Sequence, residues 1–353
     1  MSDLIKQFRE AQSGLVTQQS DFSLSAVVDM IVHNDIDVDP HYQRRDRWKP
    51  EKQSALIESF LMNVPVPPIY FSEDDYGSYS VIDGKQRLTA IKDFLLGNFP
   101  LKNLERFPEL NNYYFKDLPA PIQNALSVRP YIRVITLLQQ SDPSLKYEVF
   151  LRLNTGGEKL RQQEIRNVAY DGSLNDLLLE LSSSDFLKQQ LKIKSDTSNA
   201  YRNMDDLETI LRFFAISDNW EHFGAKLAKG LDTYMSENRS AIPEPLRKKF
   251  NRALSACEEI WGQRAFQKPL ENGWREQFIA PLYDAQMTAI SELSDREIEN
   301  LIANKERLVD EFRALFLNDK AFAKSINQAT SDSSAIKTRV SMLLKLCKGL
   351  ANG

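Results

Sequence analysis

The feature that most constrains the fold is a change of sequence pattern near residue 170. Before this point, short runs of β-branched and aromatic residues alternate with helical patterns, whereas after it helical patterns follow one another to the end of the chain. A chain of 353 residues is long enough for two domains that each bury a core. The sequence therefore predicts an α+β fold, with a small mixed sheet and its helices first and an α-helical domain second.

The pattern divides the chain into three parts. We expect an N-terminal extension over residues 1–22, a first domain over residues 23–170 and an α-helical domain over residues 171–353. The extension is polar and rich in glutamine. The stretch that follows it has a helical stripe made of Leu24, Val27, Val28, Ile31 and Val32.

A strand, a tight turn and a helix follow one another in the middle of the first domain. Residues 68–71 and 79–82 are short runs of β-formers around turn residues, which predicts a β-hairpin. Asp83 and Gly84 come directly after the second run, and a helical pattern then continues to Gly97. Two further elements are predicted beyond this unit, a buried strand over residues 131–138 and a helix that begins at Pro143.

The strand-to-helix junction carries the strongest chemical signal. A glycine after a strand lets an anion approach the backbone, and the N-terminus of a helix favours phosphate. Lys85 and Arg87 would add a point charge and a planar fork for phosphate oxygens, while Asp83 could orient one of them or hold magnesium through water. The alternative is that Asp83 and Gly84 only cap the helix and that both basic residues are solvated.

Two other segments carry groups suited to a nucleotide. Residues 41–48 place arginines around Tyr42 and Trp48, a mixture that can hold phosphates and stack a base, or that forms a solvated loop of ion pairs. Residues 150–160 contain two adjacent glycines, and Asn154 and Glu164 are oxygen ligands suited to magnesium. The alternative for this last segment is a plain turn between two helices.

Several classes of protein and site do not fit the sequence. The net charge is −4, with 45 basic and 49 acidic residues, so contact with nucleic acid must be local. No Walker A motif is present, and the three histidines are too scattered for a zinc site. Cys257 and Cys347 lie in helical patterns and are expected to be reduced and buried. No secretory or membrane-spanning pattern is visible, and we expect a cytoplasmic location.

Three stretches in this order resemble the ParB/sulfiredoxin-like domain at the N-terminus of GmrSD-type modification-dependent restriction enzymes. They are YQRRDRWKPEKQSALIESFLMNVPVPPIYF, VIDGKQRLTAI and FLRLNTGGEKLRQQEIRN. The resemblance covers roughly residues 23–170 strongly and the helical part more loosely. It implies a nucleotide-handling domain in bacterial defence against foreign DNA. The C-terminal HNH nuclease domain of full-length relatives is not recognisable in this sequence.

The resemblance also implies roles for individual residues. The family's DGQQR-type box binds and hydrolyses nucleotide, and it corresponds to catalytic roles for Asp83, Lys85, Gln86 and Arg87, with Gly84 binding the phosphates. This chain has Lys85 where the family usually has glutamine, which adds a charge. The implied nucleotide-binding residues elsewhere are Gln43, Arg44, Arg47, Arg152 and Asn154, with Asn154 and Glu164 as metal ligands.

We therefore expect a Mg²⁺-dependent nucleoside triphosphatase that controls DNA binding or a partner nuclease. The sequence does not distinguish GTP, CTP and ATP, and it leaves open whether the chain forms a homo-oligomer. Two alternatives remain. One is a magnesium-dependent DNA endonuclease in its own right that uses Asp46, Asp83 and Glu164, and the other is a non-catalytic adaptor that binds DNA or a protein.

Overall fold

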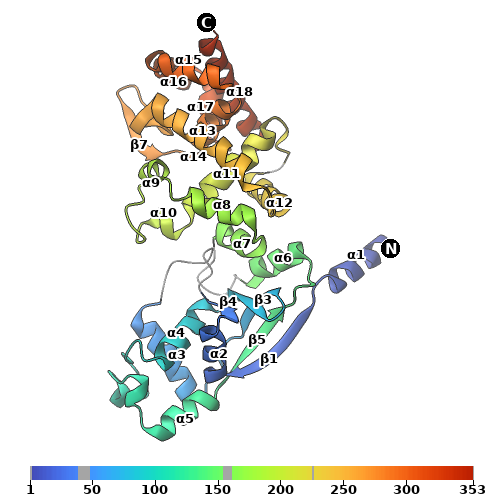
Figure 1. Cartoon of the computed structure of the whole chain (residues 1–353), viewed down its shortest axis with the longest axis vertical. Helices are drawn as coiled ribbons and strands as arrows, with labels where there is room; N and C mark the ends of the chain where they lie inside the picture. Colours follow the sequence, from blue (N-terminus) through green and yellow to red (C-terminus); the bar gives the residue numbers. More distant parts are fainter. Residues whose placement is uncertain (1, 39–47, 154–160, 225, 353) are drawn as a thin grey trace. The chain divides into compact units, whose positions relative to one another are not determined.

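The computed structural model describes residues 2–38, 48–153, 161–224 and 226–352. The chain forms two compact units, Met1–Ala169 and Tyr170–Gly353, which we name unit 1 and unit 2 (Figure 1). Unit 1 contains a mixed sheet with helices, and unit 2 is mainly helical. The predicted α+β class, with the sheet in the first part of the chain, is confirmed.

Unit 1 is built on a five-stranded sheet in the order β1-β5-β3-β4-β2. Its strands are β1 (Thr17–Ser23), β2 (Ile36–Asp37), β3 (Ile69–Asp75), β4 (Ser78–Asp83) and β5 (Tyr131–Leu137). The pairs β1–β5 and β3–β4 are antiparallel, whereas β3–β5 and β2–β4 are parallel. The predicted hairpin is therefore β3–β4, and the predicted strand over residues 131–138 is β5.

Unit 1 also contains helices, most of which pack against one or the other face of this sheet, while α1 extends away from it (Figure 1). They are α1 (Ser2–Ser13), α2 (Leu24–Val32), α3 (Pro50–Leu61), α4 (Lys85–Leu95), α5 (Ala120–Val128), α6 (Pro143–Leu153) and α7 (Gln162–Ala169), with 3-10 turns η1 (Pro108–Leu110) and η2 (Phe115–Asp117). One core cluster joins Phe71 and Val81 to α2, α3 and α4. A second joins Ile82 and Leu137 to Ile165 of α7. Val81 and Ile82 are successive residues of β4, so their side chains face opposite sides of the sheet. Because each lies in one of the two clusters, both faces of the sheet are buried.

Local signals explain where these helices begin and end. The Ser23 side chain accepts a hydrogen bond from the Ala26 N–H and caps α2. Pro50 occupies the first turn of α3, where its missing N–H is tolerated. The predicted stripe of α2 is buried except for Val32, which is 54% exposed because it is the last residue of the helix.

The N-terminal segment contains a strand that the sequence pattern did not predict. β1 pairs with β5 along its whole length, and Asp21 lies opposite Arg133. The two side chains form a bidentate pair, with both N–O distances at 3.0 Å. β1 lies at the edge of the sheet and most of its residues are exposed or half-buried, so its polar sequence does not show the alternation of a buried strand.

Unit 2 consists of consecutive helices around its own core. They are α8 (Ser173–Leu181), α9 (Asp185–Gln190), α10 (Asn199–Arg202), α11 (Asp205–Asn219), α12 (Leu227–Asn238), α13 (Pro243–Trp261), α14 (Ala280–Ser291), α15 (Asp295–Ala303), α16 (Lys305–Asn318), α17 (Lys320–Asn327) and α18 (Ser333–Ala351), with 3-10 turns η3 (Trp220–His222) and η4 (Gly262–Arg264). Cys257 and Cys347 are buried and free, as expected.

The expectation that only helices follow residue 170 was wrong at one place. Strands β6 (Gln267–Pro269) and β7 (Trp274–Phe278) form an antiparallel hairpin in unit 2. The strands are too short to give a periodic signal, so the sequence pattern missed them. The hairpin is held by helix α16, since Trp274 stacks on Phe312 with ring centroids 6.2 Å apart and Arg313 donates to the carbonyl of Leu270.

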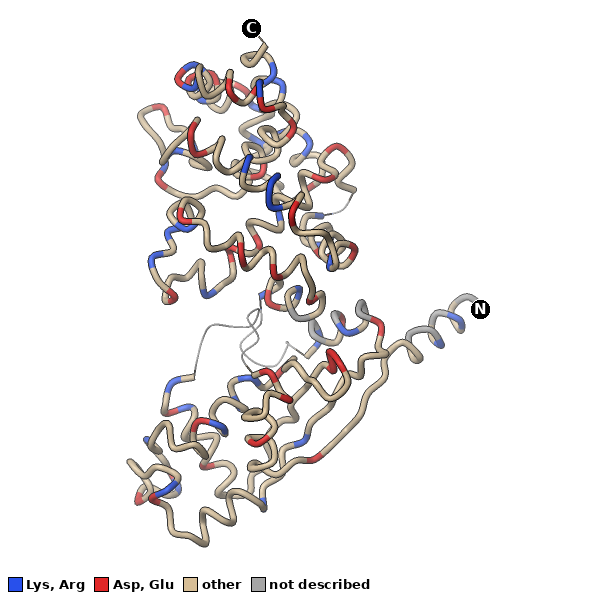
Figure 2. Tube along the Cα trace, in the orientation of Figure 1, with Lys and Arg blue, Asp and Glu red and all other residues tan. Residues whose placement is uncertain are grey.

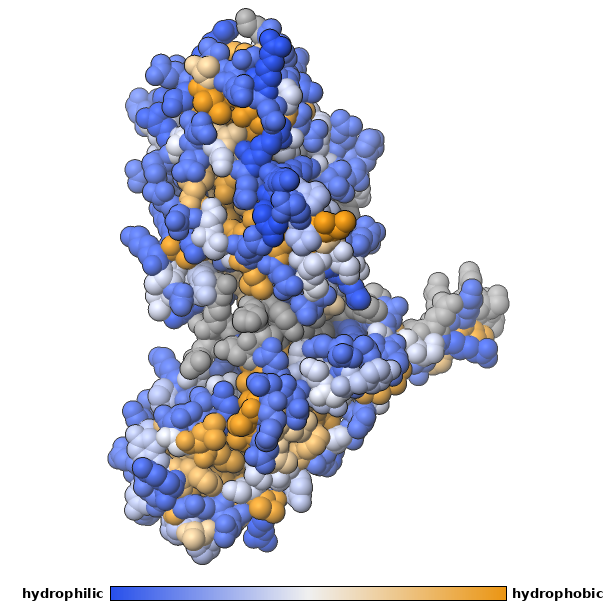
Figure 3. Space-filling view, viewed as in Figure 1, coloured by the Kyte–Doolittle hydropathy of each residue, from blue (hydrophilic) through white to orange (hydrophobic). Residues whose placement is uncertain are grey.

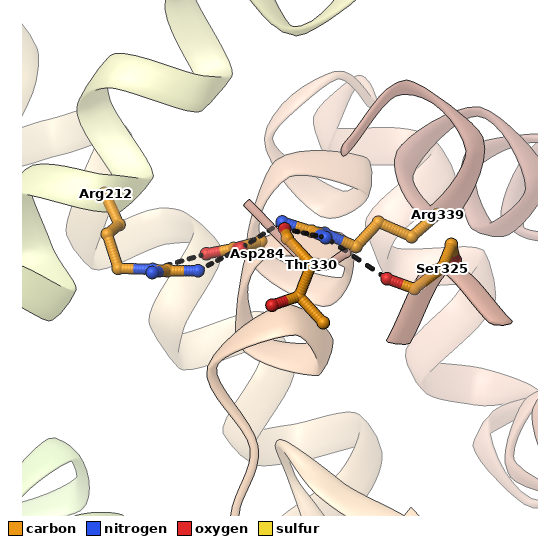
Figure 4. A network of polar contacts seen from close by, with 5 residues as sticks. All are labelled: Arg212, Asp284, Ser325, Thr330 and Arg339. Atoms are coloured by element: carbon orange, nitrogen blue, oxygen red, sulfur yellow. Dashed lines mark hydrogen bonds and ion pairs between the residues drawn. The ribbon is translucent and has the colours of Figure 1, made fainter. Parts of the chain in front are cut away.

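A buried ionic network joins three helices of unit 2 (Figure 4). The Asp284 carboxylate of α14 is fully buried and accepts from Arg212 of α11 at 2.5 Å and from Arg339 of α18 at 2.6 Å. Arg339 also donates to the carbonyl oxygens of Ser325 and Thr330. Burial lowers the pKa of Arg339, and the charge of Asp284 opposes that shift. A single carboxylate therefore compensates two buried guanidinium groups.

The surface of both units is mostly hydrophilic on the face shown in Figure 3. Along the traces of the described residues, acidic and basic residues are interspersed (Figure 2). Across the part of the chain that the structure describes, we find no helix with the length and apolar character needed to cross a membrane.

The Asp284 network predicts a large effect on stability. Asp284→Ala should lower the free energy of unfolding of unit 2 by about 3–5 kcal/mol, because both guanidinium groups would stay buried without their carboxylate. Urea unfolding followed by tryptophan fluorescence measures this. The matched control is Asp295→Ala, which removes the exposed partner of Arg252 and should change the free energy by less than about 1 kcal/mol. Equal losses in the two variants would contradict the role assigned to Asp284.

Candidate functional site

The candidate site lies where β4 ends and α4 begins. Asp83 is the last residue of β4, Gly84 is the N-cap of α4, and Lys85 is its first helical residue. Gly84 has φ +101°, a left-handed conformation that allows the chain to turn from strand to helix within one residue. No side chain caps this helix N-terminus, and its first turn contains no acidic residue. The local field therefore favours an anion.

Gly84 is also required by its close surroundings. An added Cβ would lie 2.9 Å from Cγ1 of Ile69 and 3.3 Å from Nη2 of Arg87. Ile69 is fully buried at the start of β3, so it has little room to move. Backbone conformation and packing thus both require glycine at this position.

Arg87 connects the start of α4 to the segment before β3. Its Nη2 donates to Oδ2 of Asp83 at 2.6 Å, and its Nη1 donates to the carbonyl oxygens of Pro67 and Pro68, the latter at 3.1 Å. The Arg87 side chain is only 12% exposed, whereas that of Asp83 is 52% exposed. Burial lowers the pKa of Arg87 and the Asp83 charge opposes this shift. Arg87 therefore forms part of the scaffold of the junction.

The second sequence segment meets this junction through Gln86. Its Oε1 accepts a hydrogen bond from the backbone N–H of Trp48 at 2.9 Å. The Nζ of Lys52 lies 4.5 Å from the centroid of the Trp48 ring, which places a cation against an aromatic face near the start of α4. Trp48 is the last residue of the predicted basic and aromatic segment. The predicted Gln43, Arg44 and Arg47 lie outside the described residues.

The third sequence segment approaches the same end of β4. Ile82 precedes Asp83 and shares a buried cluster with Ile165, which follows Glu164 in α7. Glu164 is 1% exposed, and its Oε2 accepts from the Arg161 N–H at 2.5 Å, so this oxygen caps the start of α7. The predicted Asn154 lies outside the described residues.

Arg152 has a different environment from the other predicted site residues. Its Nη2 donates to Oε1 of Glu148, one turn earlier in α6, and its side chain is 78% exposed. This is a surface ion pair that leaves the guanidinium accessible from solvent. Its predicted role in triphosphate binding stays a prediction.

Helix α7 contains a polar network within the third sequence segment, and the sequence analysis did not predict its burial. Gln163, Arg166 and Asn167 are each no more than 1% exposed. Gln163 donates to Oδ1 of Asn167 at 2.8 Å and accepts from Nη1 of Arg166 at 3.2 Å. Fully buried polar side chains of this kind hold a helix in one orientation. The sequence signal was the polar run QQEIRN, whose burial cannot be inferred from composition.

A metal site is not formed by acidic, histidine and cysteine residues in the described ranges. Among them no group of three or more such side chains can hold an ion. The predicted pair of Asn154 and Glu164 stays a prediction. Of the predicted residues, the structure brings together Asp83, Gly84, Lys85, Gln86 and Arg87 as one junction.

Gly84→Ala tests the packing of this junction. The substitution should lower the free energy of unfolding of unit 1 by about 2–4 kcal/mol, from backbone strain of about 1 kcal/mol and overpacking against Ile69 of about 1–3 kcal/mol. Gly97→Ala is the control, because Gly97 also has a positive φ, +75°, but an added Cβ meets nothing within 4 Å. Chemical denaturation compares the two. If Gly97→Ala is as destabilising as Gly84→Ala, contact with Ile69 contributes nothing.

Comparison with known proteins found one family model that matches the segment containing this junction. Residues 27–170 match the family model of the GmrSD restriction endonuclease, N-terminal domain. No curated protein and no solved structure matches the chain significantly. The matched segment includes β4, the turn at Gly84, α4 and α7, and thus the whole junction described above. Residues 27–170 of this chain are therefore similar to the N-terminal domain of the GmrSD restriction endonuclease, a family that suggests a role in a restriction system.

Proposed function

We propose that unit 1 binds and hydrolyses a nucleoside triphosphate at the β4–α4 junction and thereby controls DNA binding or a partner nuclease in a restriction system. The observation that carries the proposal is the meeting of three sequence segments at this junction. Gln86 accepts from Trp48 of the second, basic and aromatic segment, and Ile82 packs in one cluster with Ile165 of the third. A turn at a helix N-terminus, an aromatic ring and a polar helix are thus joined in one unit.

The phosphates would bind at the N-terminus of α4. The left-handed turn at Gly84, a buried residue, leads directly into the first turn of α4, and the helix dipole is positive at this end. Lys85 is half-buried in the first turn, where its ammonium group adds a full positive charge. Gln43, Arg44, Arg47, Arg152 and Asn154 are proposed to bind the rest of the nucleotide, by the family resemblance.

Asp83 would contribute to the reaction by positioning the attacking water molecule, and Arg87 would contribute by holding Asp83 in place. The Asp83 carboxylate is half exposed and is held by Arg87 at the edge of the proposed phosphate site. An oriented carboxylate of this kind can align a water molecule for attack on the terminal phosphate. A triphosphate carries magnesium as counter-ion, and Asn154 and Glu164 are the proposed protein ligands.

Lys85 is the residue of choice for a test. Arg87 binds the carbonyl groups of Pro67 and Pro68, so its removal would disturb the fold as well as the site. The matched control is Lys92 in the last turn of the same helix, which is also half-buried and carries the same charge. Both variants change the net charge by the same amount.

The expected result is nucleotide binding that depends on Lys85. Isothermal titration with ATP, GTP, CTP and UTP in the presence of Mg²⁺ should show one or more that bind. Lys85→Ala should weaken that binding roughly 10-fold or more, the value of one charge-assisted hydrogen bond, and Lys92→Ala should leave it unchanged. Absence of binding with all four nucleotides, or an equal loss in both variants, would overturn the proposal.

Hydrolysis and the link to DNA are measured separately. Phosphate release by the purified chain, with and without duplex DNA, should be seen with the nucleotide that binds and should fall in Asp83→Asn. Because DNA binding rests on phosphate neutralisation, any DNA-dependent stimulation should weaken as salt is raised. Turnover that is unchanged in Asp83→Asn would remove that carboxylate from the mechanism.

A further inference from the structure

A second polar site lies within unit 2, distant in sequence from the junction. A pocket of about 530 Å³ opens between the end of α9 and the β6–β7 hairpin. This size falls within the usual range for small-ligand sites, roughly 300–1,000 Å³. Its amide lining consists of Gln189, Gln190, Gln263, Gln267 and Gln277.

The aromatic part of the pocket is held rigidly. Trp274 lines the pocket and stacks on Phe312, with an interplanar angle of 11°. Phe278 lines it as well and packs against Phe266 at 5.8 Å and Tyr283 at 5.6 Å between ring centroids. The indole is half-buried, so one part of it is fixed by the core and another part is open to the pocket. A fixed, partly exposed indole is a platform for a flat ligand.

The backbone around the pocket is strained. Lys192 and Phe266 have φ values of +56° and +61°, although neither is glycine. Positive φ is rare for such residues and is retained where the surrounding structure imposes it, often at ligand sites. Lys192 lines the pocket, and Phe266 lies between the lining residues Arg264 and Gln267. The Lys192 Nζ also donates to the carbonyl of Glu276 at 2.7 Å and so ties the turn after α9 to β7.

The charges in the lining point to a ligand with an anionic part. Arg264 and Lys192 are cationic and Glu276 is anionic, which leaves one net positive charge. The guanidinium carbon of Arg264 lies 5.9 Å from the centroid of the Trp274 ring. Indole and guanidinium planes are the two groups on which proteins stack unpaired bases. A neutral sugar would use the amides and the indole but would gain nothing from the two cations.

We propose that this pocket binds a single unpaired nucleobase together with its phosphate. The base stacks on Trp274, glutamine amides pair with its edge, and Arg264 neutralises the phosphate. An amide offers one acceptor and two donors side by side, which matches the alternating donors and acceptors of a base edge. The ligand is either a free mononucleotide or one nucleotide of a single strand. The site is separate from the junction in unit 1 and does not depend on the proposed triphosphatase activity.

The test compares base-bearing and abasic ligands on the full chain. Fluorescence anisotropy is measured with a labelled DNA hexamer of mixed sequence and with an abasic hexamer that has the same number of phosphates, and titration calorimetry is measured with the four nucleoside monophosphates. The variants are Trp274→Ala, Trp274→Phe and the double variant Gln263→Ala, Gln277→Ala. The last two side chains are exposed, so the double variant keeps the core intact. Lys85→Ala serves as the control for the junction in unit 1.

The expected result is binding that requires both a base and the indole. Trp274→Ala should weaken it roughly 5- to 100-fold, the value of one base-aromatic stack, and Trp274→Phe should restore most of it. The double glutamine variant should weaken it as well, and the binding that Trp274→Ala removes should persist in Lys85→Ala. Binding of the hexamer alone identifies a strand as the source, and binding of monophosphates identifies a free nucleotide.

Other results would overturn the proposal. These are equal binding of the abasic hexamer, an unchanged affinity in both Trp274→Ala and the glutamine variant, and no binding of any base-bearing ligand. Saturable binding of a disaccharide such as maltose in place of the bases would assign the pocket to another ligand class. A loss in Lys85→Ala with no loss in Trp274→Ala would place base-dependent binding in unit 1.

Discussion

The conformation of Gly84 is the constraint on which the structure of unit 1 depends. The chain must pass from β4, which lies between β3 and the edge strand β2, into a helix at this point, and the left-handed conformation of Gly84 makes the turn within one residue. The turn places Arg87 where it reaches the carbonyl groups of Pro67 and Pro68, whose own nitrogen atoms cannot donate. Strands β3 and β4 and helix α4 are therefore joined by one guanidinium group. The same turn leaves the N-terminus of α4 without a side-chain cap, so the requirement of the fold and the proposed anion site have one origin.

In unit 2, buried charged side chains connect the core helices. Helices α11, α14 and α18 meet at Asp284, and the two arginines that bind it are compensated by a single carboxylate and by two carbonyl groups. Apolar residues would hold three helices together with less desolvation, but they would not fix their rotation and register as directional hydrogen bonds do. A core that is defined in this way can carry the short β6–β7 hairpin on its surface, where Phe312 and Arg313 of α16 fix Trp274 and the hairpin tip.

The sequence predicted those elements whose signal is local. Helices α2, α3 and α4 and the β3–β4 hairpin have periodic apolar residues and clear caps or turns, and the change of pattern near residue 170 predicted the second, helical part. Strand β1 was missed because it is an edge strand whose polar side chains are exposed, and its pairing partner is more than a hundred residues away. At the junction, residue types predicted which side chains gather, but not that Arg87 is held by two proline carbonyl groups. That contact depends on the path of a loop, which no periodicity encodes.

The two candidate sites differ in chemistry, and each is suited to a different part of a nucleotide. The junction in unit 1 offers backbone N–H groups, a helix dipole and Lys85, which respond to phosphate charge and are indifferent to the base. The pocket in unit 2 offers amides and an indole, which respond to the shape and hydrogen-bonding edge of a base and contribute only one net charge. Amide side chains from residues 189 to 277 become neighbours only after folding, so no sequence pattern indicated the pocket. The junction is therefore proposed to supply affinity through charge, and the pocket is proposed to supply selectivity through the hydrogen-bonding edge of a base, in a chain whose net charge is only −4.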